Sequence, residues 1–269
     1  MRPAWSEQFD PHMLPRVAAL PLPAAITRAW AWGDSTGRGV RVAVIDSGVD
    51  ASHPAVGHVA GGAAFTYDPD AENSVRVEEG PHDDLYGHGT ACAGIIRALA
   101  PDVELYSVRV LGANLSGKGL VFAAGLRWAI EQGAHVANLS LSTKSRDYFA
   151  LLHELADQAY FQRTMLVSAV NNVPEASYPS LYSSVFSVAA RPGDDPEAFD
   201  YNPAPPVEFG ARGIDVPVAW TGGTTVTATG NSFAAPHIAG LVARLLARHP
   251  GLAPFEVKTI LRALAANTA

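Results

Sequence analysis

Residues 230–240 of this 269-residue chain read GNSFAAPHIAG and contain a serine at the predicted start of a helix. Ser232 follows a glycine and an asparagine, and small and apolar residues continue after it to Arg248. A serine hydroxyl is a weak nucleophile until a neighbouring base removes its proton, and a third group must hold that base in one tautomer. The stretch therefore raises the question of where a histidine and a carboxylate lie.

Two other stretches contain those residue types. Residues 42–48 read VAVIDSG, an apolar strand ending at Asp46, and residues 87–94 read GHGTACAG, with His88 at the predicted start of a helix. Taken singly, an aspartate or serine there is compatible with helix or turn capping, and a histidine with a buried structural role. Their joint occurrence at strand-to-helix junctions favours a triad for acyl transfer.

These motifs, in the order Asp, His, Ser, resemble those of the subtilisin family, the subtilases. The resemblance runs from about residue 24 to about residue 265, and it includes the stretches LYSVRVLG at 105–112 and NLSL at 138–141. It implies that Ser232 is the nucleophile, that His88 is the general base and acid, and that Asp46 orients the imidazole.

The resemblance also implies an oxyanion donor from an asparagine that follows a strand. The stretch LVSAVN at 166–171 matches that segment and nominates Asn171, with Asn172 as an alternative displaced by one residue. The backbone amide of Ser232, at a helix N-terminus, is the expected second donor.

An extended substrate is expected to pair with two segments by strand addition. Ser142 and Thr143 stand where the family usually has glycines, Val170 replaces the glycine before the asparagine, and Ser177 precedes Tyr178. Added side chains reduce the volume of a pocket, so we predict a narrow pocket that prefers a small residue at the cleavage point. The residues expected to bind substrate are Leu115, Ser116, Gly117, Ser140, Leu141, Ser142 and Val170.

Other residues also depart from the family pattern. Asn231 replaces the usual threonine. Its side-chain amide either substitutes in the oxyanion site or does not reach it, in which case turnover is expected to be modest. Asp50 matches a calcium ligand of relatives but lacks its usual partners, so no metal is expected there, and no cofactor is implied. Asp83 or Asp84, in the acidic stretch 66–86, is a candidate for attracting basic substrate residues, although a solvated surface loop is the simpler interpretation.

Apolar strands alternate with helices along the chain, which predicts an α/β fold. We expect a subtilisin-like, predominantly parallel central sheet with helices on both faces. Residues 1–22 are interpreted as an irregular N-terminal extension, and residues 23–269 as one catalytic domain. Strands are expected at 40–45, 103–110, 136–141, 164–169 and 185–190, helices at 23–32, 88–98, 119–132, 148–163, 232–248 and 254–265, and a loop at 66–86.

Composition excludes several classes of function. The formal charge of −7 and the lack of a basic cluster disfavour nucleic acid as a partner. No apolar run approaches the roughly 20 residues of a membrane helix, so no membrane partner is expected. One cysteine, Cys92, and an N-terminus without an apolar leader favour a cytoplasmic protein.

The sequence thus predicts a serine endopeptidase that acts on protein or peptide substrates through an acyl-enzyme. A dedicated protease for precursors or leader peptides is one alternative. A peptide-binding scaffold with weak or no turnover is the other, supported only by the altered Asn231 and Val170.

Overall fold

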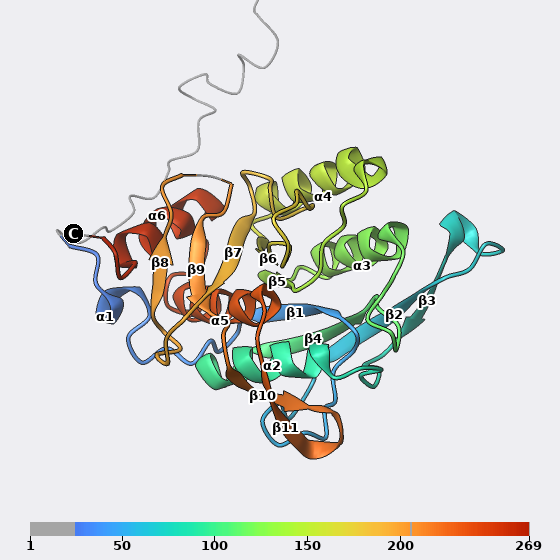
Figure 1. Cartoon of the computed structure of the whole chain (residues 1–269), viewed down its shortest axis with the longest axis horizontal. Coiled ribbons are helices and arrows are strands. Elements are labelled where there is room, and N and C mark those ends of the chain that lie inside the picture. The colour runs from blue at the N-terminus through green and yellow to red at the C-terminus, as the bar shows by residue number, and fades with distance from the viewer. Residues whose placement is uncertain (1–24, 205, 269) are drawn as a thin grey trace, which may run out of the picture.

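The computed structural model describes residues 25–204 and 206–268, so the predicted extension at 1–22 lies outside the described residues. A nine-stranded sheet forms the centre of the fold (Figure 1). Its strands are β1 (Arg41–Asp46), β2 (Gly61–Tyr67), β3 (Val75–Glu79), β4 (Glu104–Arg109), β5 (Val136–Leu139), β6 (Met165–Ala169), β7 (Phe186–Arg191), β8 (Phe199–Tyr201) and β9 (Phe209–Arg212).

The strands lie in the order β3-β2-β4-β1-β5-β6-β7-β9-β8. From β2 to β9 every neighbouring pair is parallel, and the edge strands β3 and β8 are antiparallel to their neighbours. This arrangement confirms the predicted fold class of a predominantly parallel sheet. A separate antiparallel hairpin consists of β10 (Val216–Trp220) and β11 (Thr224–Ala228).

Helices cover both faces of the sheet because successive side chains of a buried strand point to opposite faces. In β1, Val42 and Val44 join one hydrophobic cluster, whereas Ala43 and Ile45 join another. The first cluster contains α2, α5 and α6, and the second contains α3 and α4 (Figure 1). The helices are α1 (Arg28–Ala31), α2 (His88–Leu99), α3 (Gly119–Glu131), α4 (Phe149–Phe161), α5 (Asn231–Arg248) and α6 (Pro254–Leu264), with 3₁₀ turns at Glu72–Ser74, Arg146–Tyr148 and Thr221–Gly223.

Helix α5 is the central helix of the fold. Its residues from Phe233 to Leu246 are buried, and it packs against β5, β6, β7, β9 and α2. This packing places its N-terminus beside the carboxyl ends of the parallel strands, the edge at which open α/β sheets place their ligand sites.

The prediction of a loop at 66–86 is wrong, because part of it forms a hairpin of β2 and β3. Val75 and Val77 alternate with Arg76 and Glu78, but β3 is an edge strand whose side chains are mostly exposed. With little apolar surface to bury, the strand carries an acidic composition that is typical of loops.

Asp50 has a structural role in holding the β10–β11 hairpin. One carboxylate oxygen accepts from the amide of Gly222 (3.1 Å), and the other accepts from the hydroxyl (2.6 Å) and amide (2.9 Å) of Ser52. The Ser52 hydroxyl is the main cause of the lowered pKa of this carboxyl. The absence of calcium at Asp50 stays a prediction.

No helix in the described part of the chain is both long and apolar enough to cross a membrane.

Burial of His237 in α5 predicts a loss of stability in acid. Its Nδ1 donates to the carbonyl of Phe233 (2.8 Å). Burial lowers its pKa to about 4, opposed by this hydrogen bond and aided by the charge of Arg212. Between pH 6.5 and 4 the unfolded chain therefore binds a proton that the folded chain does not, so the free energy of unfolding falls as pH falls, by at most about 3 kcal/mol.

Urea titrations of the Ser232→Ala variant at pH 7 and pH 4.5 measure this loss. In a His237→Asn variant, whose amide nitrogen replaces the Nδ1 donor, we expect the loss between the two pH values to be smaller. An equal loss in both proteins would contradict the assignment to His237.

Candidate active site

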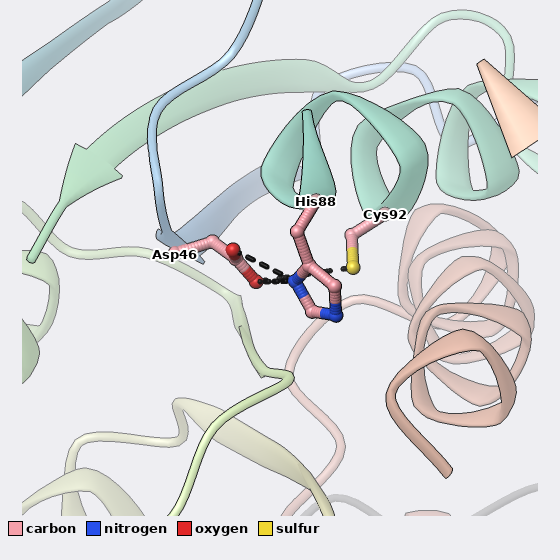
Figure 2. Close-up of side chains that lie close together, drawn as sticks. All are labelled: Asp46, His88 and Cys92. Atoms are coloured by element: carbon pink, nitrogen blue, oxygen red, sulfur yellow. Dashed lines mark hydrogen bonds and ion pairs between the residues drawn. The ribbon is translucent and has the colours of Figure 1, made fainter. Parts of the chain in front are cut away.

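Asp46 and His88 form a buried pair at the carboxyl end of β1. Asp46 is the last residue of β1 and fully buried, and His88 is the first residue of α2. The Nδ1 atom of His88 lies 2.8 and 2.9 Å from the two carboxylate oxygens, and its second ring nitrogen points away from Asp46 (Figure 2). A carboxylate on Nδ1 fixes the tautomer that leaves Nε2 free to accept a proton.

Ser232 is the second residue of α5, and it lines the same cleft as His88. Within the described residues no hydrogen bond joins the Ser232 hydroxyl to His88. Such bonds are often long in proteins without substrate and shorten in the complex. The ring of Phe233, the next residue, lies 5.3 Å from the His88 ring between centroids.

Neighbouring segments pack so closely against the two residues that flank His88 that both must be glycine. Gly87 has a φ of 118°, and a side chain there would meet the ring of Trp220. A Cβ on Gly89 would lie 2.0 Å from the carbonyl oxygen of Gly48. Only glycine lets the start of α2 contact the end of β1 this closely, which brings the histidine to the aspartate.

Asp84 stabilises the start of α2, so of the two candidates for attracting basic substrate residues only Asp83 stays a prediction. One of its oxygens accepts from the hydroxyl of Ser47 (2.7 Å) and from the amides of residues 86–87 (2.9 and 2.8 Å). The other accepts from the amide (2.8 Å) and hydroxyl (2.6 Å) of Thr90. A carboxylate with five donors has no free position for a substrate cation.

The pKa of His88 is raised above the usual value for histidine. Burial opposes the charged ring, but the charge and hydrogen bond of Asp46, together with the charge of Asp84, outweigh it. The same interactions stabilise the imidazolium that forms when the ring takes a proton.

Ser140 contacts helix α5 as well as the cleft. Its hydroxyl donates to the backbone carbonyl of Ser232 (2.9 Å) and accepts from the side-chain amide of Asn138 (3.0 Å). The thiol of Cys92 also lies 3.3 Å from this hydroxyl. The predicted substrate residue Ser140 therefore uses its side chain to support the first turn of α5.

Cys92 is a buried thiol beside the pair. Burial, and then the charge of Asp46, raise its pKa well above the usual value, so it stays protonated and is not a nucleophile. Asp46, His88 and Cys92 are the one group in the described residues whose ligand atoms could hold a metal, all within 4.8 Å of one another. A metal would require the thiolate and the Nδ1 position that already faces Asp46, so the group does not fit a resident ion.

All the residues expected to bind substrate line one cleft of about 410 Å³. Its walls also include Lys118 and Phe122, which the sequence reasoning missed. The amino group of Lys118 lies 3.2 Å from the centroid of the Tyr67 ring, a contact between segments that no local pattern connects. The predicted residues around the cleft are Leu115, Ser116, Gly117, Ser140, Leu141, Ser142 and Val170, together with His88, Asn171 and Ser232.

Two asparagines after β6 line the cleft next to Ser232. The side-chain oxygen of Asn171 accepts from the amide of Val173 (3.1 Å), and that of Asn172 accepts from the amide of Asn231 (2.9 Å). The side-chain amide of Asn231 donates to the carbonyls of Val170 (3.2 Å) and Asn171 (3.0 Å). Both donor hydrogens of Asn231 thus have partners, which favours the second alternative, that its side-chain amide does not serve the oxyanion site.

Comparison with known proteins agrees with this geometry. The model of the subtilase family matches residues 37–269. This chain belongs to the subtilase family of serine proteases. A thermostable alkaline protease of Halalkalibacterium halodurans is 35% identical over 82% of this chain and 61% of its own length. Subtilisin Savinase of Lederbergia lenta is 34% identical over 84% of this chain and 83% of its own length.

Subtilisin E of Bacillus subtilis is 32% identical over 86% of this subtilase and 61% of its own length. The subtilase thus spans less than two thirds of the full length of two of these relatives. The crystal structure of a cold-adapted subtilisin-like serine proteinase aligns with a TM-score of 0.67 over 87% of both chains, at 24% identity, and shows the shared fold.

The raised pKa of His88 predicts that activity rises with pH at a higher pH than an ordinary histidine would give. A general base must be neutral, so kcat/KM is expected to rise with pH through an apparent pKa above 6.5. Asp84→Asn removes one charge that raises this pKa and should move the rise to lower pH. The matched control is Asp34→Asn, an exposed carboxylate paired with Arg248, which should leave the profile unchanged. Hydrolysis rates of a small ester between pH 5 and 10 measure the profile, and a rise centred at or below 6.5 would contradict the prediction.

Proposed function

We propose that this subtilase is a serine endopeptidase in which Asp46, His88 and Ser232 form the catalytic triad. The observation that carries the proposal is the buried Asp46–His88 pair at the edge of the cleft that Ser232 lines. The first turn of α5 adds backbone amides that stabilise negative charge beside the hydroxyl.

In the first half of the reaction, the hydroxyl of Ser232 attacks the scissile carbonyl, and His88 Nε2 takes its proton. Asp46 stabilises the resulting imidazolium. The negative oxygen of the tetrahedral intermediate accepts from the amide of Ser232 and, in our assignment, from the side-chain amide of Asn171. His88 then gives the proton to the leaving amine, and an acyl-enzyme remains.

In the second half, water replaces the amine. His88 takes a proton from the water as it attacks the ester, and the same oxyanion donors stabilise the second tetrahedral intermediate. The proton returns to Ser232 as the new carboxylic acid leaves. Of the residues in these steps, His88, Asn171 and Ser232 line the cleft, and Asp46 lies buried behind His88.

We propose that an extended peptide binds between residues 115–117 and residues 140–142. Its backbone would form one added strand that hydrogen-bonds to both segments. Protein or peptide is the substrate class that fits this cleft. We also propose a cytoplasmic location, because the buried Cys92 is a free thiol, the state that a reducing compartment preserves.

The pocket for the residue at the cleavage point is proposed to accept small side chains. Ser142, Thr143 and Val170 line the cleft with side chains. Reciprocal backbone hydrogen bonds between Thr143 and Tyr178 (2.9 and 2.8 Å) fasten the adjoining segments together. Ser177 differs from the expectation: it is fully buried, bonds Ser180 (3.2 Å), and does not line the cleft.

A narrow pocket also favours a second candidate, a protease dedicated to one precursor or leader peptide. Such an enzyme would share the triad chemistry and differ only in how few substrates it accepts. The side chain of Val170 beside the proposed oxyanion donor is the observation that favours it.

Covalent labelling tests the proposed chemistry. A fluorophosphonate probe should label the protein on Ser232, and the Ser232→Ala variant should remain unlabelled. The Ser183→Ala variant, which loses a hydroxyl outside the cleft, is the matched control and should label normally. A wild-type protein that folds but takes no label would overturn the proposal and favour the peptide-binding scaffold.

A peptide library varied at the cleavage point tests the pocket. We expect alanine or serine to be preferred over phenylalanine, and Val170→Gly to increase relative cleavage after phenylalanine about tenfold or more, because removing the side chain widens the pocket. Val77→Gly, on the exposed strand β3, is the control and should not change the preference. A wild-type preference for phenylalanine or tyrosine would contradict the narrow pocket.

A further inference from the structure

We propose that Asn231 is a positioning residue that sets the geometry of the oxyanion site. It does so by holding residues 170–172, which follow β6, against the first turn of α5. This inference rests on the proposed function, since it concerns the same site. It assigns to Asn231 a role in transition-state stabilisation without contact with the reacting atoms.

The Asn231 side chain connects three backbone segments that are distant in sequence. Its amide nitrogen donates one hydrogen to the carbonyl of Val170 (3.2 Å) and the other to the carbonyl of Asn171 (3.0 Å). Its oxygen accepts from the amide of Ala190 in β7 (2.8 Å). The side chain is partly buried at this junction. The whole hydrogen-bonding capacity of the donor group is thus used on the loop after β6.

A second hydrogen bond runs in the opposite direction. The backbone amide of Asn231 belongs to the first turn of α5, where helix amides lack partners within the helix. It donates to the side-chain oxygen of Asn172 (2.9 Å). The two asparagines therefore form a reciprocal pair, which we call the Asn172–Asn231 latch. Each side chain binds the backbone of the other segment.

Each residue of the latch is a chain neighbour of one proposed oxyanion donor. One donor is the amide of Ser232, the residue after Asn231 in the chain. The other is the side-chain amide of Asn171, whose carbonyl accepts from Asn231 and whose side-chain oxygen is held by Val173 (3.1 Å). With that oxygen held, the nitrogen of Asn171 is the end left for substrate. The distance between the two donors thus depends on the hydrogen bonds that hold the loop after β6 against the first turn of α5.

Oxyanion stabilisation is sensitive to this distance. In subtilisin itself, loss of the asparagine donor lowers kcat by about 10²–10³. A misplacement of about 1 Å by a change outside the reacting groups costs on the order of 10². Asn231→Ala removes two hydrogen bonds to the loop and one to β7. We therefore expect kcat to fall about tenfold to hundredfold, with KM changed less than about threefold.

A double-mutant cycle with Asn171→Ala separates positioning from a general structural role. If Asn231 acts through Asn171, then Asn231→Ala should lower kcat by less than about threefold in the Asn171→Ala background. An equal loss in both backgrounds would show that Asn231 acts by another route, and it would overturn the inference. An unchanged kcat in Asn231→Ala alone, with wild-type turnover present, would also overturn it.

Asn202→Ala is the matched control. Asn202 also donates from its amide to two carbonyls (2.7 and 2.8 Å) and accepts one backbone amide (3.0 Å), but outside the cleft. We expect it to lower Tm with kcat unchanged. A comparable loss of kcat in this variant would attribute the effect of Asn231→Ala to general destabilisation and would overturn the inference.

Two further measurements keep the result interpretable. If Asn231→Ala does not fold, Asn172→Ala removes the other half of the latch and replaces it in the same cycle. We expect a smaller fall in kcat for this variant. Additive effects of Asn172→Ala and Asn171→Ala would again overturn the inference. A wild-type protein without fluorophosphonate labelling would instead show failure of the proposed triad chemistry. The two failures are therefore distinct.

Discussion

The buried carboxylate of Asp46 is the constraint on which the rest of the site depends. A fully buried charge is costly unless hydrogen bonds surround it, and here they come from the amide of Ser47 (2.8 Å) and the ring of His88. These partners require α2 to begin directly above the end of β1. The glycines at 48, 87 and 89 permit that approach, and the saturated carboxylate of Asp84 holds the helix start in place.

The hydrophobic core positions the other half of the site. Successive side chains of β1 point to opposite faces of the sheet and contribute to both hydrophobic clusters. On one face, the central helix α5 packs against β5, β6 and β7. The N-terminus of a helix fixed in this way cannot shift independently of the strand ends. The carbonyl of Ser232 accepts from the hydroxyl of Ser140, which follows β5, so Ser232 is anchored to the sheet as well as to its own helix.

Patterns local in sequence predicted most of the fold, because strands and helices follow from neighbours in the chain. The resemblance to the subtilases nominated Asp46, His88 and Ser232 as the proposed triad. The β2–β3 hairpin was missed because an exposed edge strand buries too little to show a clear apolar pattern. The alternatives for Asp84 and Asn231 could not be decided from the sequence for another reason. Each forms hydrogen bonds with segments far away in sequence, and a polar residue gives no local signal of which donors or acceptors it will meet in the fold.

In the proposed function, substrate selection and transition-state stabilisation share one short segment of this subtilase. Val170 contributes a wall of the cleft, Asn171 the proposed oxyanion donor and Asn172 one half of the latch. The side-chain amide of Asn231 donates to the carbonyls of Val170 and Asn171. A substrate side chain that displaces Val170 would therefore also strain the hydrogen bonds that hold Asn171. A bulky residue at the cleavage point would thus be disfavoured twice, by lack of space and by displacement of the donor. Because the second effect acts on the chemical step, it would discriminate in kcat as well as in KM.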